Sequence, residues 1–134
     1  MKWIYFFLGL SLFIISCNEK EKNTLFELKD NRKTGINHVN TIESSKELNV
    51  FKYRNFYNGG GVGLGDINND GLIDIYFTIN RSDNKLYLNK GNLEFEDITI
   101  KAGVAGTKPW STGVSMIDIN SDGNLDIYVS NAGI

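Results

Sequence analysis

A nine-residue acidic pattern occurs twice in this chain, and it limits the possible folds more than any other feature. The first copy runs from Asp66 to Asp74 and the second from Asp118 to Asp126, 52 residues later, and both read D-x-N-x-D-G-x-x-D. Over the longer windows 61–78 and 113–130, ten of eighteen paired residues are identical. A repeat of about this length is typical of propellers and solenoids, in which one unit cannot bury its apolar face alone.

Each copy concentrates oxygen ligands for a metal ion. Positions one, five and nine are aspartates and position three is an asparagine, with no Lys or Arg among the nine residues. Ca²⁺ suits such a set because it accepts six to eight oxygen ligands in a tolerant geometry; position seven would offer its backbone carbonyl, and glycine at position six permits the sharp turn. We therefore predict two Ca²⁺ sites, formed by Asp66, Asn68, Asp70, Leu72 and Asp74 and by Asp118, Asn120, Asp122, Asn124 and Asp126.

EF-hand and dockerin loops also contain D-x-N-x-D-G, and both are followed by a helix. The EF-hand closes with a bidentate Glu at position twelve. Position twelve is Phe77 in the first copy and Val129 in the second, and the residues around it alternate between apolar and polar. This period of two predicts strands after the loops, which excludes the EF-hand and argues against dockerin.

The same period predicts further strands. Apolar residues alternate with others at 62–64, 73–77 and 125–129, and strand-like segments at 85–89 and 93–98 are joined by a turn at 90–92 that contains Gly91. Four short strands per unit would make one blade of a β-propeller. The glycines between Gly59 and Gly65 lack the Lys-Ser/Thr ending of a phosphate-binding loop, so we expect them to mark close backbone approach. Trp110 is predicted to pack between blades rather than to bind a ligand.

The amino-terminal residues have a different character. Lys2 precedes an apolar run from Trp3 to Ile15, and Ser16 and Cys17 follow. The run is too short to span a bilayer and fits the apolar region of a secretory signal. The ending at Ser16 and Cys17 resembles the lipobox of bacterial lipoproteins, which implies a signal peptide at 1–16 and a lipidated Cys17 followed by a flexible tether at 17–24; the alternative is a plain signal with an incidental cysteine. A single cysteine excludes an internal disulfide, and lipid on Cys17 would anchor the chain.

Composition removes several classes of function. The net charge is −2 and basic runs are absent, so we expect no nucleic-acid partner. His38, the only histidine, has no visible nucleophile or carboxylate partner in the sequence and is predicted to lie on the surface or in a turn. Residues 1–134 contain no nucleophile–base pair, catalytic zinc set or cofactor fingerprint. We therefore predict no catalytic site within the chain.

The glycines 59–61 and Val62, leading into the acidic loop, resemble the FG-GAP or VCBS repeat of integrin α-subunit propellers. Residues 53–61, 85–89, 95–99 and 102–104 are similar to the bacterial lipoprotein branch of the cartilage acidic protein family, whose members often carry an ASPIC/UnbV domain. No ASPIC/UnbV segment is present here. Residues 26–36 also resemble 95–104: each has an apolar start, then a small residue, a glycine and a β-branched residue.

The resemblance implies an all-β chain with an incomplete β-propeller: a possible partial blade at 25–57, a first repeat at 58–108 and a second, truncated repeat at 109–134. We expect the chain to be the front portion of a longer protein, because two blades cannot close a ring. The implied function is a calcium-stabilised binding or scaffold module on a bacterial envelope membrane, with the outer membrane expected, and an unidentified protein or glycan partner. The alternative is the non-catalytic propeller portion of a larger extracytoplasmic hydrolase or lyase, or of a polysaccharide-capture system.

Overall fold

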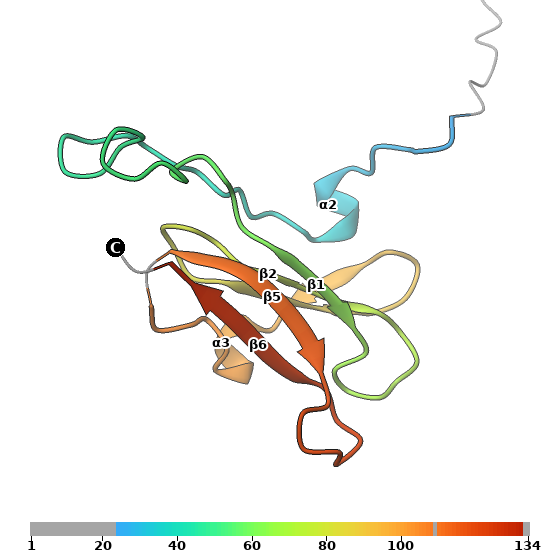
Figure 1. Cartoon of the computed structure of the whole chain (residues 1–134). Coiled ribbons are helices and arrows are strands. Elements are labelled where there is room, and N and C mark those ends of the chain that lie inside the picture. Colours follow the sequence, from blue (N-terminus) through green and yellow to red (C-terminus); the bar gives the residue numbers. More distant parts are fainter. Residues whose placement is uncertain (1–23, 109, 133–134) are drawn as a thin grey trace, which may run out of the picture.

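The computed structural model describes residues 24–108 and 110–132, and these form two antiparallel sheets (Figure 1). The first sheet has the order β1-β2-β3-β4, with strands at Val62–Gly65, Asp74–Phe77, Lys85–Asn89 and Phe95–Asp97. The second pairs β5 (Ser111–Ile117) with β6 (Asp126–Asn131). Two one-turn helices, α2 (Asn31–Thr34) and α3 (Thr99–Ala102), flank the strands. The mostly-β fold and the predicted strands are confirmed, and the sheets are blade-like, although within the described residues they close no ring.

The first sheet is a meander in which each strand pairs with the next along the chain. Its register brings Leu64 opposite Ile75, and Tyr76 opposite Leu86. The β3–β4 turn has positive φ at Gly91, Asn92 and Leu93, which delays the start of β4 to Phe95, two residues later than the sequence predicts. The β2 face that carries Asp74, Tyr76 and Thr78 is the buried one.

The two sheets meet where β1 lies beside β5 (Figure 1), and the glycines of β1 face β5 and Leu125, the residue just before β6. A Cβ on Gly63 would lie 3.2 Å from Val114, and one on Gly65 would lie 2.7 Å from Leu125. A Cβ on Gly60 would lie only 1.7 Å from the backbone oxygen of Thr78. The prediction of a close approach to the glycine backbone is confirmed for Gly60, Gly61, Gly63 and Gly65 and is wrong for Gly59, where a Cβ would meet nothing within 4 Å.

An arm between α2 and β1 leaves the sheets and returns to them (Figure 1). Gly35 precedes Asp66 by 31 residues, whereas the equivalent Gly103 precedes Asp118 by only 15. The returning part of the arm packs on Trp110, which is 2% exposed. The Trp110 ring lies 5.3 Å from that of Tyr53 and 5.5 Å from that of Phe56. Trp110 is therefore a packing residue, but the aromatic rings that it contacts belong to the arm and not to a second blade, so it joins the arm to β5.

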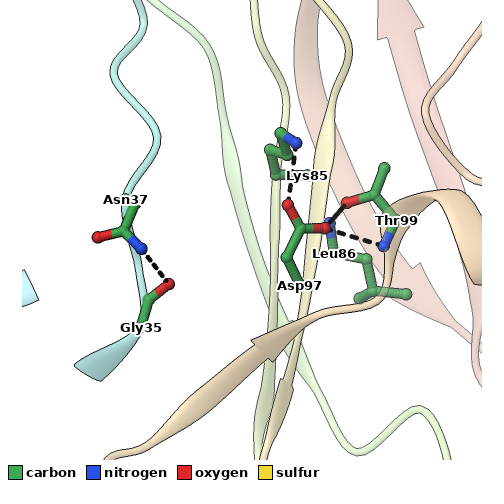
Figure 2. Close-up of polar contacts among 6 residues, drawn as sticks. All are labelled: Gly35, Asn37, Lys85, Leu86, Asp97 and Thr99. Atoms are coloured by element: carbon green, nitrogen blue, oxygen red, sulfur yellow. Dashed lines mark hydrogen bonds and ion pairs between the residues drawn. The ribbon is translucent and has the colours of Figure 1, made fainter. Parts of the chain in front are cut away.

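Asp97 ties the outer strand to the helix that follows it (Figure 2). Its Oδ1 accepts hydrogen bonds from the backbone N–H and the hydroxyl of Thr99, and its Oδ2 lies 2.9 Å from Nζ of Lys85 on β3. The Thr99 hydroxyl also accepts the N–H of Leu86 at 2.9 Å. One carboxylate thus links β3, β4 and α3.

Helices α2 and α3 end alike. Each is followed by a left-handed glycine, Gly35 with φ 78° and Gly103 with φ 70°. The predicted likeness of 26–36 to 95–104 is therefore confirmed at the helical corner. It does not extend to the strand, because Phe26 and Leu28 lie outside any sheet and are 85% and 98% exposed.

Candidate metal loops

The two acidic loops occupy equivalent places in the two sheets. The first connects β1 to β2 and the second connects β5 to β6. Position nine is in both cases the first residue of a strand, Asp74 of β2 and Asp126 of β6. A strand in this place confirms that the loops do not belong to EF-hands or dockerins, which require a helix there.

Within each loop the side chains at positions one, three and five accept hydrogen bonds from backbone N–H groups of the same loop. In the first loop, the carboxylate of Asp66 accepts the N–H groups of positions five and six at 3.0 and 2.7 Å. Asn68 Oδ1 accepts the N–H of position five at 3.3 Å, and Asp70 Oδ1 accepts the N–H of Leu72 at 2.8 Å. These contacts hold the oxygen-bearing side chains on the inner side of the turn.

The second loop repeats this pattern contact for contact. Asp118 accepts from positions five and six at 3.1 and 2.8 Å, Asn120 Oδ1 accepts from position five at 3.1 Å, and Asp122 Oδ1 accepts the N–H of Asn124 at 2.8 Å. The backbone matches as well, because position four has φ 60° in one loop and 61° in the other, and position six has 85° and 87°. The sequence repeat is therefore also a repeat of local geometry.

Position nine behaves differently in the two loops. Asp74 is fully buried, and its carboxylate accepts the N–H of Ile67 at 2.9 Å and the N–H of Asn89 on β3 at 2.8 Å. Asp126 is exposed and accepts only the N–H of Ile119, at 3.1 Å, among the described contacts. Asp74 thus fastens its loop to the neighbouring strand, which the spacing of the motif does not reveal.

Three of the loop carboxylates, those of Asp70, Asp118 and Asp122, have a lowered pKa and are stabilised in their charged form. The pKa of Asp70 lies below its ordinary value because Asn68 and the N–H of Leu72 donate to it. The pKa of Asp118 is lowered mainly by the N–H of Gly123, and that of Asp122 by the N–H of Asn124 and the amide of Asn120. These groups therefore carry negative charge at neutral pH.

The donor set fits a hard cation, since every side-chain ligand at positions one, three, five and nine is an oxygen donor. Each turn gathers two carboxylates and one amide oxygen. Within the described residues, however, no three His, Cys, Asp or Glu side chains form a group that could hold a metal. In the first loop, the Asp74 carboxylate accepts hydrogen bonds from Ile67 and Asn89 instead. Both Ca²⁺ sites therefore stay predictions.

Comparison with known families identifies this loop-and-strand unit. Residues 66–129, which span both loops and the strands between them, match the FG-GAP-like repeat. The chain contains an FG-GAP-like repeat domain. The matched residues include both acidic loops and strands β2, β3 and β4 between them, whereas β1 lies just before the match.

Relatives of the FG-GAP-like domain include cartilage acidic protein 1 of three vertebrates. The protein from Xenopus tropicalis is 33% identical over 107 residues, which is 80% of this chain and 16% of the relative. The mouse protein is 35% identical over 85 residues, and the human protein 36% identical over 85 residues. These alignments cover 63% of this chain and 13% and 12% of the two relatives. The chain therefore spans a small part of each relative's length.

One further sequence prediction, that His38 lies on the surface or in a turn, is corrected by the structure. His38 is not a surface residue: it is partly buried, its ring lies 4.4 Å from that of Phe77 and 6.1 Å from that of Tyr87, and its Nδ1 is buried without a hydrogen-bond partner. Burial, followed by the charge of Lys85, lowers the pKa of His38. The residues on either side of His38, Asn37 and Val39, contain no signal for this packing, which depends on how the arm crosses the sheet.

Asn80 is a structural residue that sequence reasoning missed. It is 1% exposed, and its amide nitrogen donates to Gly59 O at 3.0 Å and to Ser111 O at 3.1 Å. Its Oδ1 accepts from Asn40 at 2.8 Å. The tripeptide that begins at Asn80 has the form of a glycosylation sequon, but the amide nitrogen is occupied and inaccessible. The residue instead joins the arm, β2 and β5.

The predictions for the amino terminus lie outside the described residues. These are the signal peptide at 1–16, the lipidated Cys17 and most of the tether at 17–24. Among the residues that the structure does describe, no helix is both long and apolar enough to cross a membrane.

Proposed function

We propose that this chain is a calcium-stabilised, propeller-type binding or scaffold module of a membrane-anchored bacterial envelope lipoprotein. The FG-GAP-like repeat supplies the propeller-type module. The observation that carries the calcium proposal is the contact-for-contact repetition of the two loops, whose charged oxygens point inward in both sheets. Calcium has a structural role here, because each loop joins two paired strands.

Binding would offset the mutual repulsion of the loop carboxylates and hold each hairpin in register without a disulfide. Extracellular calcium modules typically have dissociation constants of about 10⁻⁴–10⁻³ M. At a free concentration tenfold above the dissociation constant, each site adds about 1.4 kcal/mol to the free energy of unfolding. Because the three acidic side chains of a loop form no group in the present arrangement, binding requires the loop to tighten.

The test is thermal unfolding of the 134-residue chain in CaCl₂ and in EGTA. We expect EGTA to lower the melting temperature by on the order of 10 °C if both sites were filled. The double variant Asp70→Ala with Asp122→Ala should melt at one temperature in both buffers. MgCl₂ serves as the matched control, since Mg²⁺ requires a stricter octahedral geometry. An unchanged melting temperature for the unsubstituted protein in EGTA would refute the calcium assignment.

The anchoring part of the proposal depends on residues 1–17 alone. The apolar run that ends at Ser16-Cys17 is the feature that supports it. Lipid on Cys17 would place the module at an envelope membrane, with the outer membrane as the proposed location and a protein or glycan as the proposed class of partner. Mass spectrometry of the amino terminus after expression in a bacterial host tests this directly. Cys17→Ser should remove the acyl mass and release the protein from the membrane fraction.

A further inference from the structure

The two acidic loops touch each other. They lie at the same end of the two sheets (Figure 1), and Asn69 at position four of the first loop donates hydrogen bonds to the second. Its Nδ2 donates to the Asn124 side-chain oxygen at 3.1 Å and approaches the Gly123 backbone oxygen at 3.4 Å. The side-chain amide of Asn69 thus contacts two residues that lie 54 and 55 positions further along the chain.

This contact connects the predicted ligands of one loop to those of the other. Asn69 stands between Asn68 and Asp70, positions three and five of the first loop. Its partner Asn124 donates its own amide to Asp122 Oδ1 at 3.1 Å. A path of two side-chain amides therefore leads from the backbone beside Asp70 to the carboxylate of Asp122.

The bridge is not part of the repeated loop geometry. The second loop has Ser121 where the first has Asn69, and the first has Leu72 where the second has Asn124. Both Asn69 and Ser121 are left-handed, with φ 60° and 61°. The backbone conformation is therefore common to both loops. Among the described contacts, the hydrogen bonds from one loop to the other come from Asn69 alone.

We infer that Asn69 couples the two loops, so that an ion in one loop strengthens binding in the other. This inference rests on the proposed calcium binding. An ion that fixes Asn68 and Asp70 also fixes Asn69 between them, and Asn69 then holds Asn124 and Asp122 in place before the second ion arrives. The first ion thereby orders part of the second loop, so less conformational entropy is lost when the second ion binds.

Electrostatics opposes this effect, because the first ion reduces the negative charge that attracts the second. At physiological ionic strength this repulsion is weakened over about 8 Å. Substitution of Asn69 changes no charge. A comparison between the unsubstituted protein and an Asn69 variant therefore isolates the contribution of the bridge.

The experiment is an NMR titration of the ¹⁵N-labelled 134-residue chain with CaCl₂, in which the amides of Gly71 and Gly123 report the two loops separately. The coupling factor is the dissociation constant of the first loop in Asp122→Ala divided by that in the unsubstituted protein. Asn69→Gly, alone and with Asp122→Ala, gives the same factor without the bridge, and glycine retains the left-handed backbone. Ser121→Gly is the matched control, since it makes the same change in the second loop and leaves the bridge intact.

We expect Asn69→Gly to reduce the coupling factor by about three- to tenfold, the effect of one exposed polar hydrogen bond. Ser121→Gly should leave it unchanged. Equal factors with and without Asn69, or an equal loss in Ser121→Gly, would overturn the inference while calcium binding stands. If neither glycine amide shifts in 10 mM CaCl₂, about tenfold above the weakest dissociation constant expected of such modules, the proposed calcium binding itself is wrong.

Discussion

At the scale of single residues, the two copies of the motif differ most at position nine. The sequence gives both copies an aspartate there, but Asp74 is buried with two backbone donors, and Asp126 is exposed with one. The difference arises because β2 has β3 as a second neighbour, whereas β6 pairs only with β5 among the described strands. The same residue type therefore fastens a loop in one sheet and stays accessible in the other.

Asp74→Ala should consequently cost more stability than Asp126→Ala. Removal of the Asp74 carboxylate leaves the N–H groups of Ile67 and Asn89 without this partner in a partly buried place, at about 1 kcal/mol for each. Urea denaturation in EGTA measures the two variants without any contribution from bound metal. Equal losses in the two variants would show that Asp74 has no fastening role.

The space around Gly60 and Gly113 leads to a second prediction for single residues. A Cβ at Gly60 would lie 1.7 Å from the Thr78 backbone oxygen, whereas a Cβ at Gly113 would lie 3.8 Å from its nearest neighbour, the Ser130 side chain. Gly60→Ala should lower the free energy of unfolding by about 1–3 kcal/mol or more, because the backbone must move. Gly113→Ala is the control and should be tolerated. The same denaturation measurement decides between these outcomes, and a harmless Gly60→Ala would contradict the close approach.

At the scale of elements, alternation of apolar residues is a good guide to where strands lie and a poor guide to their surroundings. It predicts β1, β2, β3 and β6 because the side chains of a strand alternate between two faces. It does not predict that Asp74, Tyr76 and Thr78 form the buried face of β2, since their partners come from distant parts of the chain. Thr78, for instance, donates its hydroxyl to Thr112 O.

The packing of the arm and the hydrogen bond between Asn69 and Asn124 could not be predicted from the sequence for the same reason. The segment between Gly35 and Asp66 is 16 residues longer than the equivalent segment before Asp118, and the packing of Phe56 on Trp110 depends on the path of the arm. The metal ligands are different, because their spacing lies within nine residues and the turn geometry follows from it. Local patterns could be read from the sequence, whereas contacts across 30 or more residues could not.

The corner between β4 and α3 predicts a response to acid. Burial alone would raise the pKa of Asp97, but the hydrogen bonds from Thr99 and Lys85 outweigh it, and the pKa lies below its ordinary value. A lowered pKa in the folded state means that this stabilisation is present above the unfolded value of about 3.9 and is lost as the pH falls through the folded value. Asp97→Asn should therefore weaken the fold at pH 7 and flatten the loss of stability below about pH 4.

Glu96→Gln is the control for this experiment, because Glu96 lies on the same strand but only pairs with Lys90 at 3.6 Å on the surface. Denaturant unfolding at a series of pH values gives both curves. An Asp97→Asn curve that runs parallel to that of the unsubstituted protein would remove Asp97 from the acid response.

At the scale of the whole molecule, the second sheet ends in a free edge. Among the described strands, β6 pairs only with β5, and Tyr128 on β6 is 62% exposed. An exposed apolar edge strand is a template for pairing with another chain. The 134-residue chain should therefore self-associate with rising concentration. Sedimentation velocity would measure this.

Tyr128→Lys should suppress the association, since a lysine on an edge strand opposes edge-to-edge pairing. Tyr57→Lys is a matched control, because Tyr57 is similarly exposed at 65% but lies in the arm outside any strand. If Tyr57→Lys disperses the protein and Tyr128→Lys does not, the contact lies in the arm and not at β6.

The contact that Gly63 and Gly65 of β1 make with the second sheet has a consequence for how this molecule tolerates mutation. Side chains normally fasten one sheet to another, and shortening them loosens the joint. Here one side of the contact consists of glycines, which have no side chain to shorten, and the other side consists of the side chains of Val114, Met116 and Leu125. Replacement of Gly63 or Gly65 by alanine or valine should therefore be harmful, although a hydropathy scale would rate it as an improvement.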